Sequence, residues 1–495
     1  MPARISNKQR QWLECLLLLA LAVLLRGLFI GKTDLGRDES FSLYAAQLSL
    51  SDIVKVLCQG DNPPLWELLL HGWIRIFGVS ETAIRSLSLI FSALTVIPIY
   101  FIGEKHIRRF AGIAAALCYC CSTFSIYLSH ECRVYSLLGF AAACSAWLFI
   151  SMINEPKTFK FILLTLVNLT LMYGHYLSVW IIVMEFLIVF LVHPIRQKIW
   201  KPYLIHALAL ILLFAPMFPV LLTRFLDSGV HGTWIEKSTG VENLYDFLWR
   251  MCNVPVTTVI VLVIMLSALV QWIVMVVRKA YHFGTGTILT LLWAVPLVAS
   301  FLLSFLTGFM LDRYFYFLFP LFYLAIEGYC ATLFAKRQPW CLGLLALVPV
   351  MMAVSCSPDS STKRFSGWHI PVKPIVKELV EAKDHDNTLV ILPEFIDKQF
   401  AYYLDDDHAT FRANRKPVTD YSFQEDLSRK GYYYDCNYRE ADLSRYSAVA
   451  FPYHKAMPLE EIQRYLEAQG FQFMKETDAH PYAVRYYSAP PSSLP

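Results

Sequence analysis

Two adjacent carboxylic acids, Asp38 and Glu39, follow directly after the first long hydrophobic segment of the chain. A carboxylate near hydrocarbon is costly unless a partner neutralises it or a reaction uses it, so this pair is a functional candidate. Asp38 is the candidate general base and Glu39 its supporting neighbour. The alternative is structural, because acidic residues are also favoured at a helix N-terminus and a helix is expected to begin near Ser40. The residues themselves do not separate the two interpretations.

A second group of candidates lies at a short junction between two hydrophobic segments, where Glu131, Arg133 and Tyr135 follow one another at every second position. The junction is too short to be a solvated loop, so Arg133 should lie near lipid headgroups. An arginine there can bind a lipid phosphate by forked hydrogen bonds. It can also extend to the headgroups or pair with Glu131.

Three further positions carry weaker signals. His175 and Tyr176 occupy a tight turn, Arg313 and Tyr314 begin a later hydrophobic segment, and Arg26 lies near the end of the first segment. A lone histidine in a membrane turn is more often a structural group than a catalyst. The joint signal is stronger, because five ionisable residues map to one face of the membrane in the predicted topology: Arg26, Asp38, Arg133, His175 and Arg313.

Metal binding is only weakly indicated. The acidic run 405–407, followed by His408, is interpreted as a solvated surface, with cation binding as the alternative. His231 and Glu236 lack convincing ligand spacing. We therefore predict no metal and no other cofactor.

The composition is that of a polytopic membrane protein. The chain has 495 residues, of which 56% are hydrophobic and only 17% charged. The net charge of +4 comes from basic residues in short loops, which indicates membrane topology and not a nucleic-acid partner. The first apolar run, residues 12–30, has the length of one span. That length, with no small-residue cleavage site after it, favours a span over a cleaved signal peptide.

Apolar runs predict about eleven transmembrane helices, with a cytoplasmic N-terminus and the C-terminus on the outer face. The runs cover approximately residues 12–30, 84–103, 110–128, 134–152, 161–174, 176–193, 203–222, 255–277, 285–307, 314–334 and 341–356. Two outer loops are long, 31–83 and 223–254. Within the first loop, residues 65–77 have a helical apolar period and are expected to lie in the membrane interface; the alternative is an early start of the second span.

The composition becomes polar after residue 356, so we divide the chain into a transmembrane domain, 1–356, and a soluble domain, 357–495, on the outer face. Within the soluble domain, residues 389–392 and 448–451 are predicted strands, and residues 397–404 and 459–469 are predicted helices. The alternation of strand and helix indicates a small α/β domain.

The order of these motifs resembles the glycosyltransferase-C superfamily, over about residues 12–330. It is similar, more narrowly, to bacterial relatives of dolichyl-phosphate-mannose protein mannosyltransferases and of lipid A aminoarabinose transferases. The motifs are the acidic pair Asp38-Glu39, the segment Asn62-Pro63-Pro64-Leu65, Arg85 in the next helix, Glu131-x-Arg133-x-Tyr135, His175-Tyr176 and Arg313-Tyr314. Asp61 stands where relatives often carry an aromatic residue or lysine, so the acceptor cannot be carried over.

The resemblance implies an enzyme that moves a monosaccharide from a polyprenyl-phosphate carrier to an envelope glycan, lipid or protein at the outer face of the bacterial cytoplasmic membrane. Asp38 would accept the acceptor's proton, while Arg133 and Arg313 would neutralise the lipid-phosphate leaving group. Transfer would invert the anomeric centre and need no metal. The predicted substrate-binding residues are Arg26, Asp61, Arg85, Glu131, Arg133, Tyr135, His175, Tyr176, Arg313 and Tyr314.

Two other classes of function remain open. Many spans with ionisable residues also fit a transporter or flippase for a lipid-linked substrate, which should place such residues near the bilayer midplane and show an internal repeat. A non-catalytic scaffold of an envelope-assembly complex would use the soluble domain as its binding module. The clustering of candidates at one membrane face favours the transferase.

Overall fold

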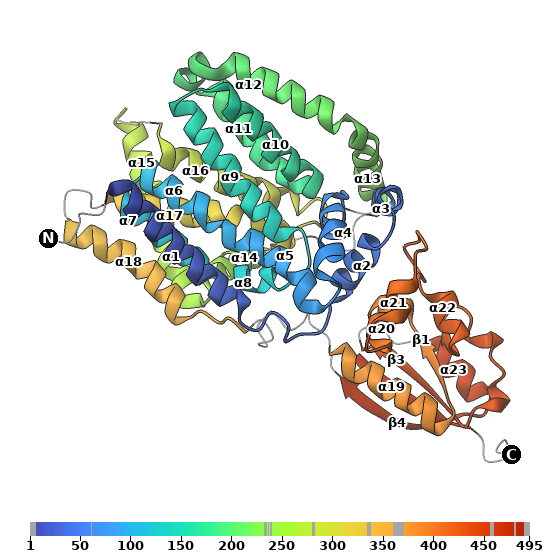
Figure 1. The fold of residues 1–495 in the computed structure, drawn as a ribbon. Coiled ribbons are helices and arrows are strands. Elements are labelled where there is room, and N and C mark those ends of the chain that lie inside the picture. The colour runs from blue at the N-terminus through green and yellow to red at the C-terminus, as the bar shows by residue number, and fades with distance from the viewer. Residues whose placement is uncertain are drawn as a thin grey trace. The chain divides into compact units, whose positions relative to one another are not determined.

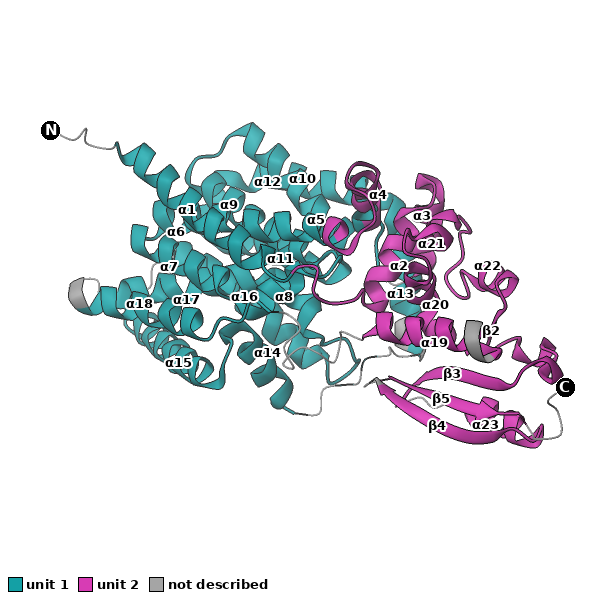
Figure 2. Ribbon diagram, turned by 60° about the horizontal axis from the view of Figure 1, so that its bottom comes forward, with its two compact units in different colours: residues 1–29, 61–66, 85–360 teal, residues 30–60, 67–84, 361–495 magenta. Residues whose placement is uncertain are grey.

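The chain folds into two compact units (Figures 1 and 2). The computed structural model describes residues 6–489, except 61, 232–234, 236, 238–239, 280–282, 334–337, 360–370, 456–459 and 480–481. Unit 1 comprises residues 1–29, 61–66 and 85–360, and unit 2 comprises residues 30–60, 67–84 and 361–495.

This division differs from the predicted domains in one respect. The boundary at residue 360 lies close to the predicted one at 356, but most of loop 31–83 belongs with the C-terminal residues and not with the hydrophobic helices. The physical reason is hydrogen bonding and packing within unit 2. The backbone N–H of Leu35, for example, donates to the hydroxyl of Tyr403 at 2.6 Å, and Leu35 is fully buried.

Unit 1 is helical in the residues described. Its elements are α1 (Asn7–Gly27), α5 (Glu81–Leu94, whose first turn belongs to unit 2), α6 (Val96–His106), α7 (Arg109–Cys120), α8 (Thr123–Ser129), α9 (Tyr135–Asn154), α10 (Thr158–Gly174), η1 (Tyr176–Ser178), α11 (Val179–Leu191), α12 (His193–Phe214), η2 (Ala215–Met217), α13 (Phe218–His231), α14 (Glu242–Cys252), α15 (Pro255–Val277), α16 (Thr285–Leu303), η3 (Asp312–Leu318), α17 (Phe319–Leu333) and α18 (Gln338–Val354).

The predicted number of eleven spans is not confirmed. Among the described residues, six helices are long and apolar enough to cross a membrane, or seven if the bent pair α7 and α8 is one span. Several predicted runs form shorter apolar helices, such as α10 and α11. The first predicted run forms α1, which carries Arg10, Glu14 and Arg26 among its apolar residues. The apolar runs therefore predicted the positions of the helices better than the number of membrane spans.

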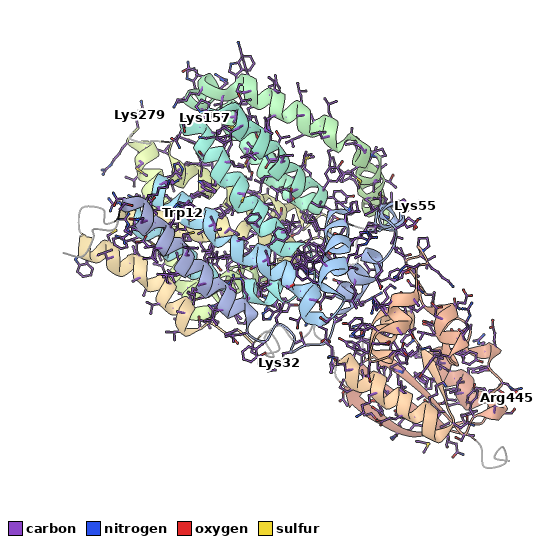
Figure 3. The ribbon with its side chains drawn as sticks, in the orientation of Figure 1. Trp12, Lys32, Lys55, Lys157, Lys279 and Arg445 are labelled. Atoms are coloured by element: carbon purple, nitrogen blue, oxygen red, sulfur yellow. The ribbon has the colours of Figure 1, made fainter. Side chains whose placement is uncertain are left out.

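Basic loop residues gather at one end of unit 1. Lys157 follows α9 and Lys279 follows α15, and Figure 3 shows both at the same end of the unit. This agrees with the prediction that both loops face the same side of the membrane. Which side that is stays a prediction.

Close backbone contact joins α6 to α7. A Cβ atom added at Gly103 would lie 2.2 Å from the Cα of Gly112, so the two glycines allow the helices to touch through their backbones. Small residues are what such close helix contacts in membranes require. Helix α7, which precedes α8 and the turn bearing Arg133, is thereby fixed against α6.

Unit 2 combines loop helices with a small α/β domain. The loop helices are α2 (Arg37–Ala46), α3 (Leu50–Gln59) and α4 (Leu65–Phe77), of which α4 begins in unit 1. Helix α4 spans the predicted residues 65–77 and is followed by Gly78, whose φ of 82° suits glycine. It exposes Leu69, Ile76 and Phe77. The helix is confirmed, whereas its position in the membrane interface stays a prediction.

The α/β domain contains one five-stranded sheet of order β2-β1-β3-β5-β4. Strands β1 (Thr388–Leu392) and β3 (Ala448–His454) and helices α20 (Asp397–Leu404) and α23 (Glu460–Ala468) confirm the predicted elements. The sequence analysis missed β2 (Tyr432–Tyr434), the antiparallel pair β4 (Gln472–Ala479) and β5 (Tyr482–Ser488), and several helices. These helices are α19 (Val372–Asp386), α21 (Ala409–Ala413) and α22 (Gln424–Arg429). The predicted α/β class is correct, with a parallel half, β2-β1-β3, and an antiparallel edge.

The contact between Gly103 and Gly112 predicts opposite effects for two glycine-to-alanine changes. Gly103→Ala should destabilise the protein by about 1–3 kcal/mol through overpacking. Gly343→Ala in α18, where a Cβ meets nothing within 4 Å, should be neutral or stabilising because alanine favours helices. Thermal unfolding in detergent measures both, and equal effects would contradict the packing argument.

Candidate functional site

Three turns that are distant in sequence meet in unit 1. Arg133 lies between α8 and α9, His175 between α10 and η1, and Arg313 in η3. The ring of His175 lies 4.9 Å from that of Tyr314, and the Arg313 guanidinium lies 5.9 Å from the same ring. Tyr135 stacks on Tyr314 at 6.4 Å. We call Glu131, Arg133, His175 and Arg313 the arginine cluster.

Glycines allow the three turns to approach. A Cβ at Gly174, the last residue of α10, would lie 2.7 Å from Leu138 Cδ2 on α9. A Cβ at Gly139 would lie 2.9 Å from the ring of Tyr316 in η3. Side chains at these positions would push α10 and η3 away from α9. The glycines therefore help to place His175 and Arg313 beside the turn that carries Arg133.

The turn that carries Arg133 is fixed by its neighbours. The indole N–H of Trp66 donates to the carbonyl of Cys132 at 3.1 Å, and the Ser88 hydroxyl donates to the carbonyl of Arg133 at 3.3 Å. The Tyr127 hydroxyl donates to the Glu131 carboxylate. Trp66 and Ser88 thus hold two successive carbonyls, which orients the side chain between them.

The cluster is mostly buried, which strengthens its electrostatics. Arg133 and Arg313 are each 8% exposed, and Glu131 and His175 are also buried. Asp312 forms an ion pair with Arg250 of α14 at 3.2 Å and accepts the backbone N–H of Arg313 at 2.8 Å. The ion pair links the second long loop to η3.

His175 is held in its neutral form. Burial, followed by the charges of Arg133 and Arg313, lowers the pKa of His175 to about 4. Its Nδ1 accepts the backbone N–H of Leu177 at 3.2 Å, which places the ring proton on Nε2. A neutral histidine between two arginines can donate a hydrogen bond without adding a third positive charge.

The arrangement suits an anion. Three arginines stand against two carboxylates, so the group of Arg133, Arg313, Arg250, Glu131 and Asp312 keeps one net positive charge. Guanidinium groups match phosphate by paired hydrogen bonds, and partial burial makes the attraction stronger than in water. The chemistry that this part of unit 1 can supply is binding and stabilisation of a phosphate.

Other predicted residues of unit 1 lie in different surroundings. Arg26 is fully buried, donates to the Ser92 hydroxyl at 2.7 Å and to the carbonyl of Tyr119 at 3.1 Å, and lies over the Tyr119 ring. These contacts join α1 to α5 and α7, and the binding of substrate by Arg26 stays a prediction. Arg85 is fully buried in α5, and Tyr176 is half-buried in η1. Asp61 lies outside the described residues.

Asp38 and Glu39 lie in unit 2, in the first turn of α2. The Glu39 carboxylate is buried and accepts the backbone N–H of Gly36 at 2.9 Å. Glu39 therefore caps the N-terminus of α2, which is the structural role that the sequence analysis gave as the alternative to catalysis. Asp38 is half-buried. The geometry thus shows a structural contact for Glu39, and Asp38 stays the candidate base.

Sequence reasoning missed the positioning residues Trp66, Ser88, Tyr127 and Arg250. Trp66 directly follows the Pro63-Pro64-Leu65 motif, and this neighbourhood was its only signal. The other three depend on tertiary contacts that the sequence does not display. Within the described residues, no group of three or more histidine, cysteine or acidic side chains is placed to hold a metal ion.

Comparisons with known proteins bear on the fold and the family. A family model described as dolichyl-phosphate-mannose-protein mannosyltransferase matches residues 61–222. A search of the curated proteins found no match. The matched range contains the turns of Arg133 and His175.

Three solved structures are similar over most of the chain. ArnT from Cupriavidus metallidurans in the apo state has a TM-score of 0.60 at 10% identity, covering 97% of this chain and 98% of that chain. The same protein bound to undecaprenyl phosphate has a TM-score of 0.60 at 9% identity, covering 95% and 97%. An oligosaccharyltransferase from Archaeoglobus fulgidus, tethered to an acceptor peptide, has a TM-score of 0.50 at 9% identity, covering 99% and 75%. Together with the family model, these folds confirm the resemblance to the glycosyltransferase-C superfamily.

The depressed pKa of His175 predicts a pH-dependent stability. The unfolded histidine takes up a proton near pH 6.5, whereas the folded one does so only near pH 4. Acidification through this window therefore favours the unfolded chain, by at most about 3 kcal/mol. Thermal unfolding in detergent should fall more steeply between pH 6.5 and 4.5 in wild type than in His175→Gln. Parallel curves would show that His175 already titrates normally in the folded protein.

Proposed function

We propose that this chain is a membrane glycosyltransferase that moves a monosaccharide from a polyprenyl-phosphate carrier to an envelope acceptor. We place the reaction at the outer face of the bacterial cytoplasmic membrane, with the N-terminus in the cytoplasm. The observation that carries the proposal is the meeting of Arg133, His175 and Arg313 in unit 1, within a glycosyltransferase-C fold.

The arginine cluster supplies what a lipid-phosphate leaving group needs. When the anomeric bond breaks, negative charge grows on the phosphate oxygens, and guanidinium groups that are already fixed stabilise that charge without reorganisation. A phosphate leaves as an anion, so the leaving group needs no general acid. The Trp66 and Ser88 hydrogen bonds keep Arg133 preorganised for this task.

Asp38 supplies the other half of the reaction. We assign it as the base that accepts the proton of the acceptor hydroxyl as that oxygen attacks the anomeric carbon. Attack from the face opposite the phosphate inverts the anomeric centre through an oxocarbenium-like transition state, as in inverting glycosidases. Glu39 supports this role indirectly, because its bond to Gly36 fixes the turn in which Asp38 lies.

The transporter alternative would be favoured by ionisable groups in the middle of the bundle, and Glu185 of α11 is one. It is fully buried, yet its carboxylate accepts hydrogen bonds from Ser145 at 2.6 Å, Asn168 at 2.8 Å and Tyr203 at 3.4 Å. These donors belong to α9, α10 and α12, so the network joins four helices. A carboxylate satisfied in this way fits a structural link better than a translocation path.

Replacing the base tests the chemical step. Asp38→Asn should reduce transfer by at least about 100-fold, because the amide cannot take the proton. Mass spectrometry of envelope lipids, glycans and glycoproteins should show one sugar lost from one acceptor class while its polyprenyl-phosphate donor accumulates. Asp52→Asn, which changes a half-buried aspartate in the first turn of α3 in the same unit, is the control at matched membrane abundance. Wild-type transfer in Asp38→Asn would overturn the assignment.

Replacing the arginines tests the phosphate site separately. Arg133→Gln and Arg313→Gln should each weaken binding of undecaprenyl phosphate to the purified protein by about 10–100-fold, the loss expected for a charge-assisted hydrogen bond. Arg278→Gln, at the exposed end of α15, is the control. If all three variants bind like wild type, the cluster does not recognise the lipid phosphate.

A further inference from the structure

Within unit 2, side chains of the C-terminal α/β domain form hydrogen bonds with the backbone of the residues just before Asp38. Both backbone polar groups of Leu35 are bonded to side chains of α20. Its N–H donates to the Tyr403 hydroxyl at 2.6 Å, and its carbonyl accepts from the Gln399 amide at 2.9 Å. Gln399 and Tyr403 are one helical turn apart and share a face of α20. Leu35 directly precedes Gly36, the N-cap of α2.

The Tyr403 hydroxyl also forms a hydrogen bond with a second segment of loop 31–83. It donates to the Glu81 carboxylate at 2.6 Å. Burial and that carboxylate raise the pKa of Tyr403, so the hydroxyl keeps the proton that it donates. Lys373 of α19 pairs with Glu81 at 2.7 Å, and its backbone N–H donates to Asp34 at 2.8 Å. Helices α19 and α20 of the domain therefore bind two successive loop residues, Asp34 and Leu35.

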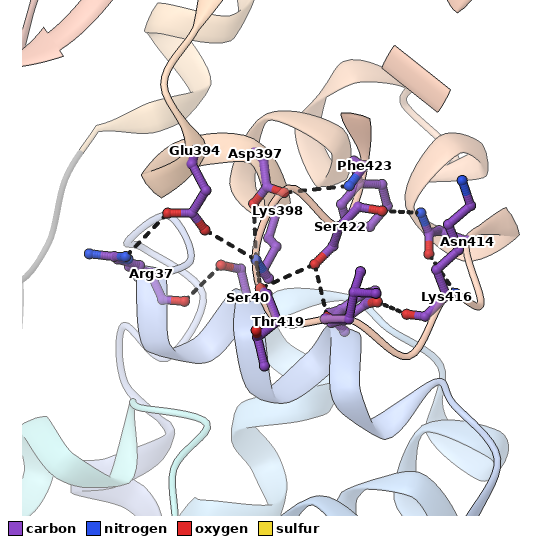
Figure 4. A network of polar contacts seen from close by, with 12 residues as sticks. Arg37, Ser40, Glu394, Asp397, Lys398, Asn414, Lys416, Thr419, Ser422 and Phe423 are labelled. Carbon is purple, nitrogen blue, oxygen red and sulfur yellow. Dashed lines mark hydrogen bonds and ion pairs between the residues drawn. The ribbon is translucent and has the colours of Figure 1, made fainter. Parts of the chain in front are cut away.

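Helix α2 itself makes further contacts with the domain. Arg37 pairs with Glu394 at 3.6 Å, and Glu394 lies 3.8 Å from the buried Lys398 (Figure 4). At the far end of the helix, the Tyr44 hydroxyl donates to the carbonyl of Lys416, and its ring packs edge-on against Phe423. The helix that carries Asp38 is thus held at its start and at its end by the α/β domain.

We propose that the C-terminal α/β domain is a positioning device for the transfer reaction, in which Gln399 and Tyr403 hold Leu35 and thereby fix Asp38. The inference rests on the proposed role of Asp38 as the base. Loss of either hydrogen bond leaves a backbone group of the buried Leu35 without its partner, which favours opening of the segment. A base must lie within hydrogen-bond reach of its proton, so a loosened Asp38 transfers more slowly even when the substrates still bind.

Two variants and a matched control test the inference. Tyr403→Phe and Gln399→Met each remove one bond to Leu35 while keeping side-chain volume. Tyr453→Phe is the control, because the Tyr453 hydroxyl also donates to a glutamate, Glu476, at 2.9 Å, but within the sheet. Hydrogen exchange of the full-length protein in detergent reports on the backbone of residues 35–46, and mass spectrometry of cells reports transfer.

The expected result has three parts. Exchange over residues 35–46 should rise at least tenfold in both variants and stay unchanged in Tyr453→Phe. Transfer should fall about tenfold in the same two variants. Binding of undecaprenyl phosphate to the purified proteins should remain within twofold of wild type, because the arginine cluster belongs to unit 1. General unfolding would instead weaken lipid binding and raise exchange throughout the chain.

Distinct outcomes overturn distinct claims. Faster exchange with transfer within twofold of wild type, while Asp38→Asn abolishes transfer, would overturn the positioning inference alone. Unchanged exchange in both variants, or equal losses in Tyr453→Phe, would overturn it as well. Full transfer in Asp38→Asn would overturn the proposed function of Asp38 and, with it, the inference built on that role.

Discussion

The cost of burying charge governs this structure more than any other constraint. A guanidinium or carboxylate placed among apolar helices survives only with hydrogen-bond partners that replace water. Arg26 meets the requirement with backbone carbonyls and Ser92, and Glu185 meets it with three donors from neighbouring helices. These two buried groups therefore fix the helices around them. The arginine cluster differs in keeping an excess of positive charge, and the proposed phosphate site rests on that excess.

Local sequence patterns determine which parts of the fold could be predicted. Helix α4 and strands β1 and β3 were predicted because each has its own apolar period or run between turn residues. The number of spans was not, because α1 carries charges that are satisfied only in the folded bundle and because α7 and α8 are bent relative to one another. The pair β4 and β5 was missed because its exposed edge mixes apolar and charged residues, as in Phe473, Met474 and Lys475.

The candidate site shows the same limit. Sequence alone placed Arg133, His175 and Arg313 at one membrane face, and the structure brings their side chains together. What the sequence did not reveal is how they are positioned, because Trp66, Ser88 and the close approach at Gly174 matter only through contacts with distant segments. It also did not separate Asp38 from Glu39, since that distinction depends on which carboxylate turns back to the helix N-terminus.

The way in which unit 2 is assembled from three separate stretches of chain has a consequence for biosynthesis. Residues 30–60 emerge early, but the α/β domain that completes their unit begins at residue 361. At about 5–20 residues per second, an interval of roughly 15–60 s separates the two events on the ribosome. During that interval Leu35 and Tyr44, which are buried in the folded protein, lack the residues of the α/β domain that contact them. The loop therefore exposes these side chains until the last part of the protein is made.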